Sequence, residues 1–465
     1  MWMSCFRAHR QRVAFIAGLG ALVGGSSICR TERSPQVPKL VIFSGGSAFN
    51  GIAEPLSAVF PSCAHVLPVS DDGGSTAEIV RVIGGPAIGD IRSRCLRLSD
   101  TSTAEARAVR ALLGHRLPHS AAAAKEEWGA IVDGSSPLWQ GVSTPFKDTI
   151  RAFLVHFYQE VLRSGEARRG EAHFSFSNGS VGNFFFAGAR VFFHSLDAAL
   201  FLYARVSRIP PDACVLPAIQ VQSDERVTLG AELADGRKLL GQSEISHPAA
   251  GSSIVDKEGA GLLPSPVARV FYVSSEPSRH EVTKRAHPAV LEKIAAADAV
   301  VFGMGSLWTS ICPSLLVAGV SECLAALPKE APRILLLNGS HDRETDGMDA
   351  SDVVRAVAST LNEGRTDGQR LEASAYVNTL FVPAGGSFAV DAVELHTLGV
   401  RLVVEVESEF DGRGRAQYQP DALVEALQVY THRTRGYREV KSLRWRESSG
   451  VDRPMLAIEE RGGPR

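Results

Sequence analysis

Short apolar runs alternate with amphipathic segments along most of the chain. Lys39–Phe43 and Ala64–Val69 have the length and composition of buried strands, and Phe49–Phe60 between them has the apolar spacing of a helix. Further strands are expected at Ala213–Ile219, Arg226–Leu229, Val267–Val273, Ala299–Phe302, Arg333–Leu337, Val377–Val382 and Arg401–Glu405. Strands that alternate with helices predict an α/β fold with a mainly parallel sheet flanked by helices.

A long segment, residues 101–170, interrupts this alternation. Within it, Thr103–Arg116 and Pro145–Arg163 have helical periodicity, whereas Ala121–Ala124 and Asp133–Pro137 have the composition of a linker and a turn. We therefore expect a helical insertion that covers one side of the sheet.

Two segments after the insertion have less regular patterns. Phe174–Phe193 contains a strongly apolar helix pattern, which Ser180 and Asn183 are placed to cap, although both could also present polar groups to a ligand. Lys238–Ile245 is predicted to be a short strand with a glycine bend, followed by a loop rich in glycine, serine and alanine.

These patterns divide the chain into five parts. Residues 1–37 are expected to be a targeting or disordered extension, because they carry arginines and no acidic residue before Glu32, and the apolar stretch Val13–Val23 is too short to span a bilayer. The remaining parts are the first part of the core at 38–100, the helical insertion at 101–170, the rest of the core and ligand-binding domain at 171–432, and a polar tail at 433–465.

Composition excludes several classes of protein. Hydrophobic residues make up 45% and charged residues 22% of the chain, and the net charge of −2 gives no bulk attraction to nucleic acid or to an anionic membrane. Seven scattered cysteines without a Cys-x-x-Cys pair indicate neither a disulfide framework nor a zinc site. We expect a cytoplasmic or organellar protein, not a secreted one, without a membrane span.

The loops after the first two predicted strands carry the first candidate chemistry. Gly45, Gly46 and Ser47 follow one strand, and glycines there let the backbone approach an anion beside the start of a helix. Asp71 and Asp72 follow the next strand, and two carboxylates beside a phosphate require a cation or ribose hydroxyls between them. A tight turn and a helix cap are the alternatives for each loop alone. Together, at the ends of successive strands, the loops favour a phosphorylated ligand.

A second glycine loop follows the strand Ala299–Phe302. Gly303, Gly305 and the hydroxyl of Ser306 suit a phosphate or a sugar diphosphate, with an ordinary turn as the alternative. In the loop after Arg333–Leu337, His341 and Arg343 could reach a phosphate, whereas Glu344 and Asp346 are interpreted as plain loop acids. Asp349 and Asp352 resemble a capping box at the start of the following helix.

Two better-known phosphate motifs do not fit. The dinucleotide fingerprint G-x-G-x-x-G fails because the third glycine is displaced after Gly46, which weakens but does not exclude a nicotinamide-dependent dehydrogenase, since Asp71 stands near the position of a ribose-binding acid. The P-loop motif fails because Asp90 occupies the position of its lysine.

Seven motifs in order give the chain a recognisable signature: SGGSAFNGI, PVSDDGGST, GDIRSR, SNGSVGN, GQSEI, VVFGMGSLWTSICPSLLVAGV and ETDGMDASDVVRA. They resemble the superfamily of 2-phospho-L-lactate transferase and the gluconeogenesis-factor-like proteins, and their details are closer to the second branch. The resemblance runs from about Lys39 to Tyr430 and implies a Rossmann-like core that binds nucleotide-derived phosphate esters. The first loop, SGGSAFN, and the helical insertion depart from the family pattern.

The resemblance also implies a function. One branch moves a phosphate-linked group from a nucleoside-diphosphate donor to a hydroxyl acceptor with magnesium. The other binds a UDP-sugar and is regulatory. By this resemblance Asp71 and Asp72 are the magnesium ligands and the catalytic residues, and Asn183 matches the asparagine of the family's helix motif. The phosphate contacts it implies are Gly45, Gly46, Ser47, Gly305 and Ser306. We expect Mg2+ as cofactor, a nucleoside-diphosphate or UDP-sugar ligand, and a homodimer as one possible assembly.

Overall fold

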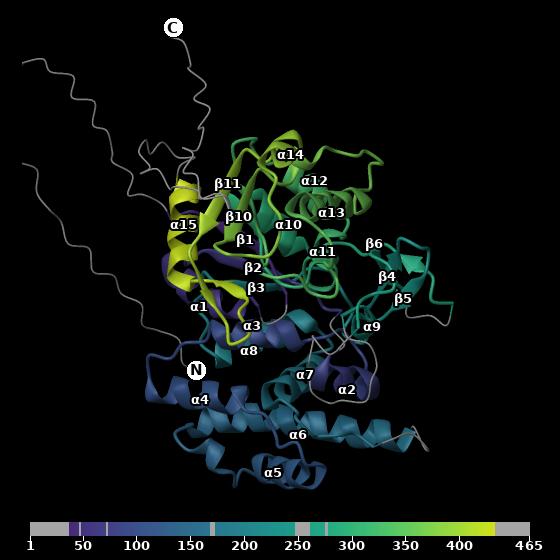
Figure 1. Cartoon of the computed structure of the whole chain (residues 1–465). Helices are drawn as coiled ribbons and strands as arrows, with labels where there is room; N and C mark the ends of the chain where they lie inside the picture. The colour runs from purple at the N-terminus through teal and green to yellow at the C-terminus, as the bar shows by residue number, and fades with distance from the viewer. Residues whose placement is uncertain are drawn as a thin grey trace, which may run out of the picture. The chain divides into compact units, whose positions relative to one another are not determined.

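The structure, a computed structural model, describes residues 37–45, 48–70, 73–167, 173–246, 261–274 and 278–432 (Figure 1). The predicted N-terminal extension, apart from its last residue, and the polar tail lie outside these residues. The loop residues Gly46, Ser47, Asp71 and Asp72 do as well.

A seven-stranded sheet forms the centre of the described core, in the order β11-β10-β9-β8-β1-β2-β3. Every neighbouring pair in it is parallel. Its strands are β1 Leu40–Phe43, β2 Cys63–Leu67, β3 Cys214–Pro217, β8 Ala299–Phe302, β9 Arg333–Leu336, β10 Thr379–Pro383 and β11 Leu402–Val406. The α/β class and the mainly parallel sheet predicted from the sequence are confirmed.

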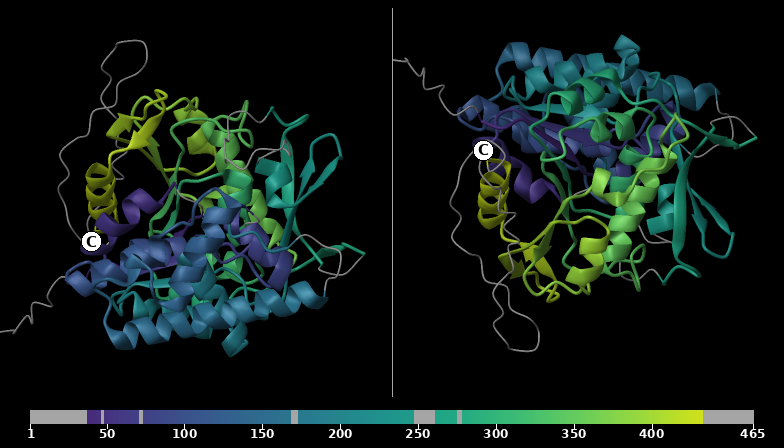
Figure 2. Two further views of the ribbon diagram at one scale, coloured as in Figure 1. Left: turned by 90° about the horizontal axis from the view of Figure 1, so that it is seen from below. Right: turned by 90° about the horizontal axis from the view of Figure 1, so that it is seen from above.

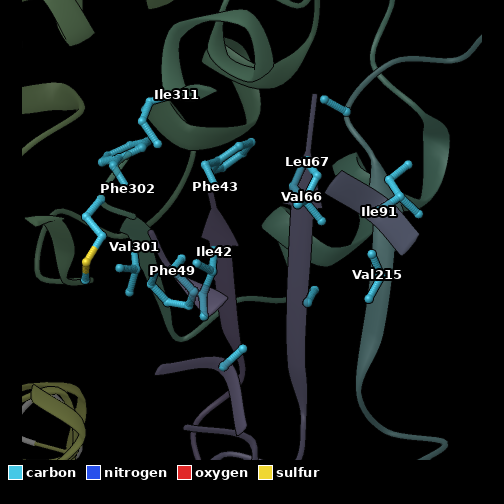
Figure 3. Close-up of a cluster of buried hydrophobic side chains, with 14 of the residues drawn as sticks. Ile42, Phe43, Phe49, Val66, Leu67, Ile91, Val215, Val301, Phe302 and Ile311 are labelled. Carbon is cyan, nitrogen blue, oxygen red and sulfur yellow. The ribbon is translucent and has the colours of Figure 1, made fainter. Parts of the chain in front are cut away.

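The strands near the middle of this sheet are buried on both faces, as their continuous apolar runs predict. All residues of β1 and β8 are buried, and the rings of Phe43 and Phe302 stack with centroids 5.9 Å apart. Ile311 lies with these two rings, whereas Phe49 lies near Ile42 (Figure 3). The two glycine loops therefore begin at neighbouring, rigid strands.

Helices cover the sheet and connect its strands. They are α1 Asn50–Val59, α2 Gly74–Ile83, α3 Gly89–Arg97, α7 Val181–Phe193, α8 Leu196–Val206, α10 Pro288–Ala295, η2 Leu307–Ile311, α11 Cys312–Leu315, α12 Val320–Ala325, α13 Ala350–Glu363, η3 Ala373–Ala375, α14 Ala392–Thr397 and α15 Pro420–His432. The capping box predicted at α13 is confirmed, because the side chains of Asp349 and Asp352 each accept from the other's backbone N–H. Ser180 caps α7, as expected.

The segment between α3 and α7 contains α4 Ala104–Gly114, α5 Ala121–Asp133, η1 Pro137–Trp139 and α6 Thr144–Ala167. These helices gather beside α7 in Figures 1 and 2, and the ring of Phe157 on α6 stacks on Phe184 of α7 at 4.7 Å. The expectation of a linker at Ala121–Ala124 is wrong. The alanines are strong helix formers, and Trp128 anchors α5 by burying its ring against Phe176.

A second, antiparallel sheet has the order β5-β4-β6-β7, with strands β4 Thr228–Leu233, β5 Lys238–Leu240, β6 Val267–Val273 and β7 Glu281–Val282. A hairpin of β12 Ser408–Phe410 and β13 Ala416–Tyr418 precedes α15. The predicted strand Lys238–Ile245 is only half correct. Gly241 adopts a φ of +101°, which ends β5, and the short helix α9 Gln242–Ser246 follows. In the part of the chain that the structure describes, no helix is long and apolar enough to cross a membrane.

Candidate functional site

The candidate site lies at the carboxyl ends of β1, β2 and β8. The chain passes from β1 through β2 to β3 on one side, whereas β8 to β11 extend from the other side of β1. The sheet therefore has a topological switch point between β1 and β8, which is where open parallel sheets bind ligands. Ser44 and Gly45 follow β1, Gly303 to Ser306 follow β8, and α2 begins at Gly74 after β2.

The two glycine loops pack directly against each other. A β-carbon on Gly45 would lie 2.9 Å from both the β-carbon and the carbonyl oxygen of Ser310. Gly305 has a φ of +143°, and a β-carbon on Gly303 would lie 3.0 Å from Phe49 and Ser44. Glycines are therefore needed at these positions for close approach of two backbones, whether or not a ligand lies there.

The first loop rests on a buried arginine. Arg94 of α3 is fully buried, and its Nη1 donates to Ser44 Oγ at 3.0 Å and to His65 Nδ1 at 2.9 Å. Its Nε donates to Asn50 Oδ1 at 3.1 Å, and its guanidinium carbon lies 5.0 Å from the centroid of the Phe49 ring. We call Ser44, Asn50, His65 and Arg94 the arginine cluster.

The arginine cluster carries a net positive charge. Burial lowers the pKa of Arg94 to about 10, which leaves the guanidinium charged at neutral pH. Burial and the nearby guanidinium keep the pKa of His65 well below its usual range, so its imidazole is neutral. Among the described residues, no carboxylate is hydrogen-bonded to Arg94, and its Nη2 has no partner.

Asn183 connects α7 with the start of α2. Its amide nitrogen donates to Ser75 Oγ at 3.0 Å and to Thr76 Oγ1 at 3.5 Å, and its amide oxygen accepts from Arg92 Nε at 2.7 Å. Ser75 and Thr76 belong to the first turn of α2, which follows the predicted Asp71–Asp72 pair. The expected capping role of Asn183 is therefore wrong, because its buried side chain links α7 to the first turn of α2 and to Arg92 instead.

The second loop is fixed by a buried carboxylate. Glu344 Oε2 accepts from the backbone N–H of Trp308 at 2.8 Å and of Thr309 at 3.1 Å. Its Oε1 accepts from the hydroxyls of Thr309 and of Ser246 at the end of α9. We call Ser246, Trp308, Thr309 and Glu344 the glutamate cluster. The interpretation of Glu344 as a plain loop acid is wrong, since only 4% of the residue is exposed.

The environment of Glu344 opposes its negative charge. Burial, and secondarily the charge of Asp342, raise its pKa from 4.5 to about 7, against the opposing effect of the hydrogen bonds from Ser246, Thr309 and Trp308. A buried carboxyl group with four donors around it is thus close to its titration point at neutral pH.

Most of the backbone N–H groups expected to hold a phosphate in the second loop already have protein partners. Gly305 N donates to Asn338 Oδ1 at 3.1 Å, and Asn338 Nδ2 donates back to the Gly305 carbonyl at 2.8 Å. Gly303 N donates to the carbonyl of Phe43 at 2.6 Å. The N–H groups at the start of η2 are bound by Glu344, in the place that an anion takes at a helix N-terminus.

The structure therefore places some of the predicted site residues together and does not describe others. Gly45, Gly303, Gly305 and Ser306 lie together where the two loops meet, and Asn183 lies at the start of α2. The assignments of Asp71, Asp72, Gly46 and Ser47 concern residues outside the described part and stay predictions. Sequence reasoning assigned no role to Arg92, Arg94, Asn338 or Ser246, although the first two belong to the GDIRSR motif and the last follows GQSEI directly.

Two of the cavities formed by the described residues lie at this edge of the sheet. The larger, about 390 Å³, opens at the end of β3 and is lined by residues that include Asp197, Gln220, Gln222 and His287. Its lining contains no lysine or arginine, which makes it a poor phosphate site. The smaller, about 20 Å³, lies between Gly305 and Asn338. No group of three His, Cys, Asp or Glu side chains in the described ranges is placed to hold a metal.

The fold and the site define the class of the protein. It is an α/β protein with a Rossmann-like parallel sheet, and its candidate site lies where the strand order of that sheet reverses. The family model "2-phospho-L-lactate transferase CofD" matches residues 40–405. The chain belongs to this family.

Curated relatives and solved structures agree with this placement. A Saccharomyces cerevisiae protein named "Uncharacterized protein YNL011C" is 32% identical, over 70% of this chain and 83% of the yeast protein. The "Gluconeogenesis factor" of Halalkalibacterium halodurans is 24% identical, over 70% of this chain and 75% of that protein. A crystal structure of a UPF0052 family member from Bacillus halodurans has the same fold, with a TM-score of 0.58 and 20% identity over 84% of this chain and 99% of the other.

Proposed function

We propose that the protein binds a nucleoside diphosphate compound at the carboxyl ends of β1, β2 and β8 and transfers a phosphate-linked group to a hydroxyl acceptor. The observation that carries this proposal is the direct packing of the loops after β1 and β8 at the switch point of the sheet. Membership of a family described as 2-phospho-L-lactate transferase supports a transferase.

Within this site, we place the phosphates on the side of the first loop. The N–H groups of Gly305, Trp308 and Thr309 are already bound by Asn338 and Glu344, which leaves little for an anion at the second loop. Ser44, at the exit of β1, belongs to the positively charged arginine cluster, and α2 directs its N-terminal end to the same edge of the sheet.

Asp71 and Asp72 would hold a magnesium ion in this arrangement. Two adjacent carboxylates and phosphate oxygens are the ligands that Mg2+ prefers, and a bound ion would offset the charge of the diphosphate. The described residues contribute by holding the segment that follows these carboxylates in the sequence, since Asn183 bonds to Ser75 in the first turn of α2 and to Arg92.

A second candidate function is a non-catalytic regulator that binds a UDP-sugar. The relative named "Gluconeogenesis factor" supports it, since its match extends over 70% of this chain. Both functions use the same diphosphate site and differ in turnover. A nicotinamide-dependent dehydrogenase is a weaker alternative.

Thermal unfolding of the full chain separates these functions. We expect UDP or GDP compounds with MgCl2 to stabilise the protein, by about 2.7 kcal/mol at a hundredfold excess over Kd, and NAD to leave it unchanged. Equal stabilisation by NAD would support the dehydrogenase. Mass spectrometry then follows the nucleotide compound during prolonged incubation with the protein and cell extract. A transferase consumes its donor, whereas a non-catalytic regulator leaves the UDP-sugar intact.

A further inference from the structure

Arg94 differs in what it binds from two other buried arginines, Arg190 and Arg333. At the amino end of β9, Arg333 donates to backbone carbonyls of Leu324, Leu327 and Pro328, and so connects the chain locally. Arg190 likewise donates to the carbonyls of Gly84 and Ser223. Arg94 instead binds only side chains, and Ser44 and Asn50 among them flank the first glycine loop.

The charge of Arg94 is only partly compensated within the chain. Burial lowers its pKa, and the nearby carboxylate of Asp90 on the same helix acts in the opposite direction without a hydrogen bond to the guanidinium. The side-chain partners of Arg94, namely Ser44, Asn50 and His65, are all uncharged, and the guanidinium Nη2 has no hydrogen-bond partner in the described part of the chain. The cluster therefore keeps a guanidinium charge at the exit of β1 without a direct ion pair to a described residue.

The geometry fixes how Arg94 could act. The side chain is fully buried, so it does not touch a ligand in this conformation. It holds the Ser44 hydroxyl at the exit of β1, and the next residue, Gly45, packs on Ser310 of the second loop. The positive charge of the Arg94 guanidinium therefore lies near the point where the two loops meet.

We propose that Arg94 is a positioning residue that fixes the loop after β1 and supplies, from beneath it, the positive charge that offsets the phosphates of the ligand. This inference rests on the proposed function. It assigns a role to the GDIRSR motif and makes recognition at the first loop depend on ligand charge.

The test compares Arg94→Met and Arg94→Lys with Arg333→Met, a matched loss of a buried arginine at the opposite end of the sheet. Calorimetry with MgCl2 measures the affinity for UDP, inorganic pyrophosphate and neutral uridine, and circular dichroism measures folding. We expect Arg94→Met to weaken UDP and pyrophosphate at least tenfold and uridine less than threefold. Arg94→Lys should restore part of the loss, and Arg333→Met should lower stability without changing the affinities.

Equal weakening of uridine and UDP, or unchanged UDP affinity in a folded Arg94→Met protein, would overturn the assignment. Should Arg94→Met not fold, Ser44→Ala takes its place, since it removes only the hydroxyl that Arg94 holds. We then expect weaker UDP binding, and unchanged affinity would overturn the proposal. If the wild-type protein binds pyrophosphate but not UDP, the proposed function fails while the role of Arg94 stands. If it binds neither anion, both fail.

Discussion

The two halves of the candidate site each hold a glycine loop in place, but with buried groups of opposite charge. Both hold a glycine loop at the end of a buried strand, and sequence reasoning gave both loops the same role. On one half, the arginine cluster supports the loop after β1 with a buried cation that has no hydrogen-bonded carboxylate among the described residues. On the other, Glu344 accepts four hydrogen bonds and binds the N–H groups at the start of η2.

A glycine loop before a helix is therefore not in itself a phosphate site. The helix N-terminus attracts an anion in either case, but after β8 the anion is a side chain of the protein itself. After β1 no described residue takes that place. We therefore expect the glutamate half to be mainly structural and the arginine half to bind the ligand.

The largest effect on stability is expected for Glu344→Ala. The substitution leaves the buried N–H groups of Trp308 and Thr309 without acceptors, and each such group costs about 1–3 kcal/mol. We expect a loss of about 3 kcal/mol or more in urea unfolding. Asp346→Ala, at an exposed acid of the same loop, is the control and should change stability by less than about 0.5 kcal/mol. A folded Glu344→Ala protein with wild-type stability would show that the glutamate half is not a structural clamp.

Gly305→Val should disturb the junction of the two halves. Its β-carbon would lie 3.3 Å from Ser310 and 3.5 Å from the Gly45 carbonyl, at a φ of +143° that valine avoids. We expect the protein to fold with a loss of about 1–3 kcal/mol and to lose UDP binding in calorimetry. Gly303→Ala is not the milder change that its size suggests, because Gly303 is enclosed by Phe49 and Ser44. Gly51→Ala, with no atom within 4 Å of its β-carbon, is the better control. Unchanged UDP affinity would separate the second loop from the site.

The pH dependence of stability should report the charge of the glutamate half. Because the pKa of Glu344 is raised from 4.5 to about 7 on folding, the folded state holds more protons than the unfolded state in that window. The free energy of unfolding should therefore fall as pH rises from 4.5 to 7, by about 3 kcal/mol at most. Glu344→Gln removes this dependence, whereas the effect of His65 is common to both proteins and cancels in their difference. Parallel pH profiles would contradict the raised pKa.

The smallest effect on stability is expected for Asp71→Asn, on the ligand-binding half. The variant should unfold within about 0.5 kcal/mol of the wild type if this carboxylate holds a cation and does not cap a helix. Its affinity for UDP should fall at least tenfold with MgCl2 present and stay unchanged in EDTA, as measured by calorimetry. If stability falls and affinity does not, Asp71 is a helix cap, which was the alternative interpretation of this loop.

The fold was largely predictable because its strands are short apolar runs that the sheet buries on both faces. Ala299–Phe302 is a strand over the same residues in prediction and structure. The helix α3 was not predicted. Its sequence, GDIRSRCLR, is polar, yet Arg92 and Arg94 point into the protein, and no periodicity rule anticipates buried arginines.

The candidate site was predictable in part. Loop residues after strands were found because parallel strands bring their carboxyl ends to one edge of the sheet. The partners of these loops were not, because Glu344 and Asn338 follow a different strand and meet the second loop only in the folded protein. The sequence indicated which segments converge. It did not indicate which backbone N–H groups of the second loop donate to other side chains of the protein and are therefore not free for a phosphate.

A crystal structure of the full chain with UDP and MgCl2 tests the assignment of the phosphates to the first loop most directly. We expect the diphosphate over the first loop, within hydrogen-bond distance of the N–H groups at Gly45 to Ser47, with the metal at Asp71 and Asp72. Density for the diphosphate at the start of η2 in place of Glu344, or only in the cavity at the end of β3, would contradict it.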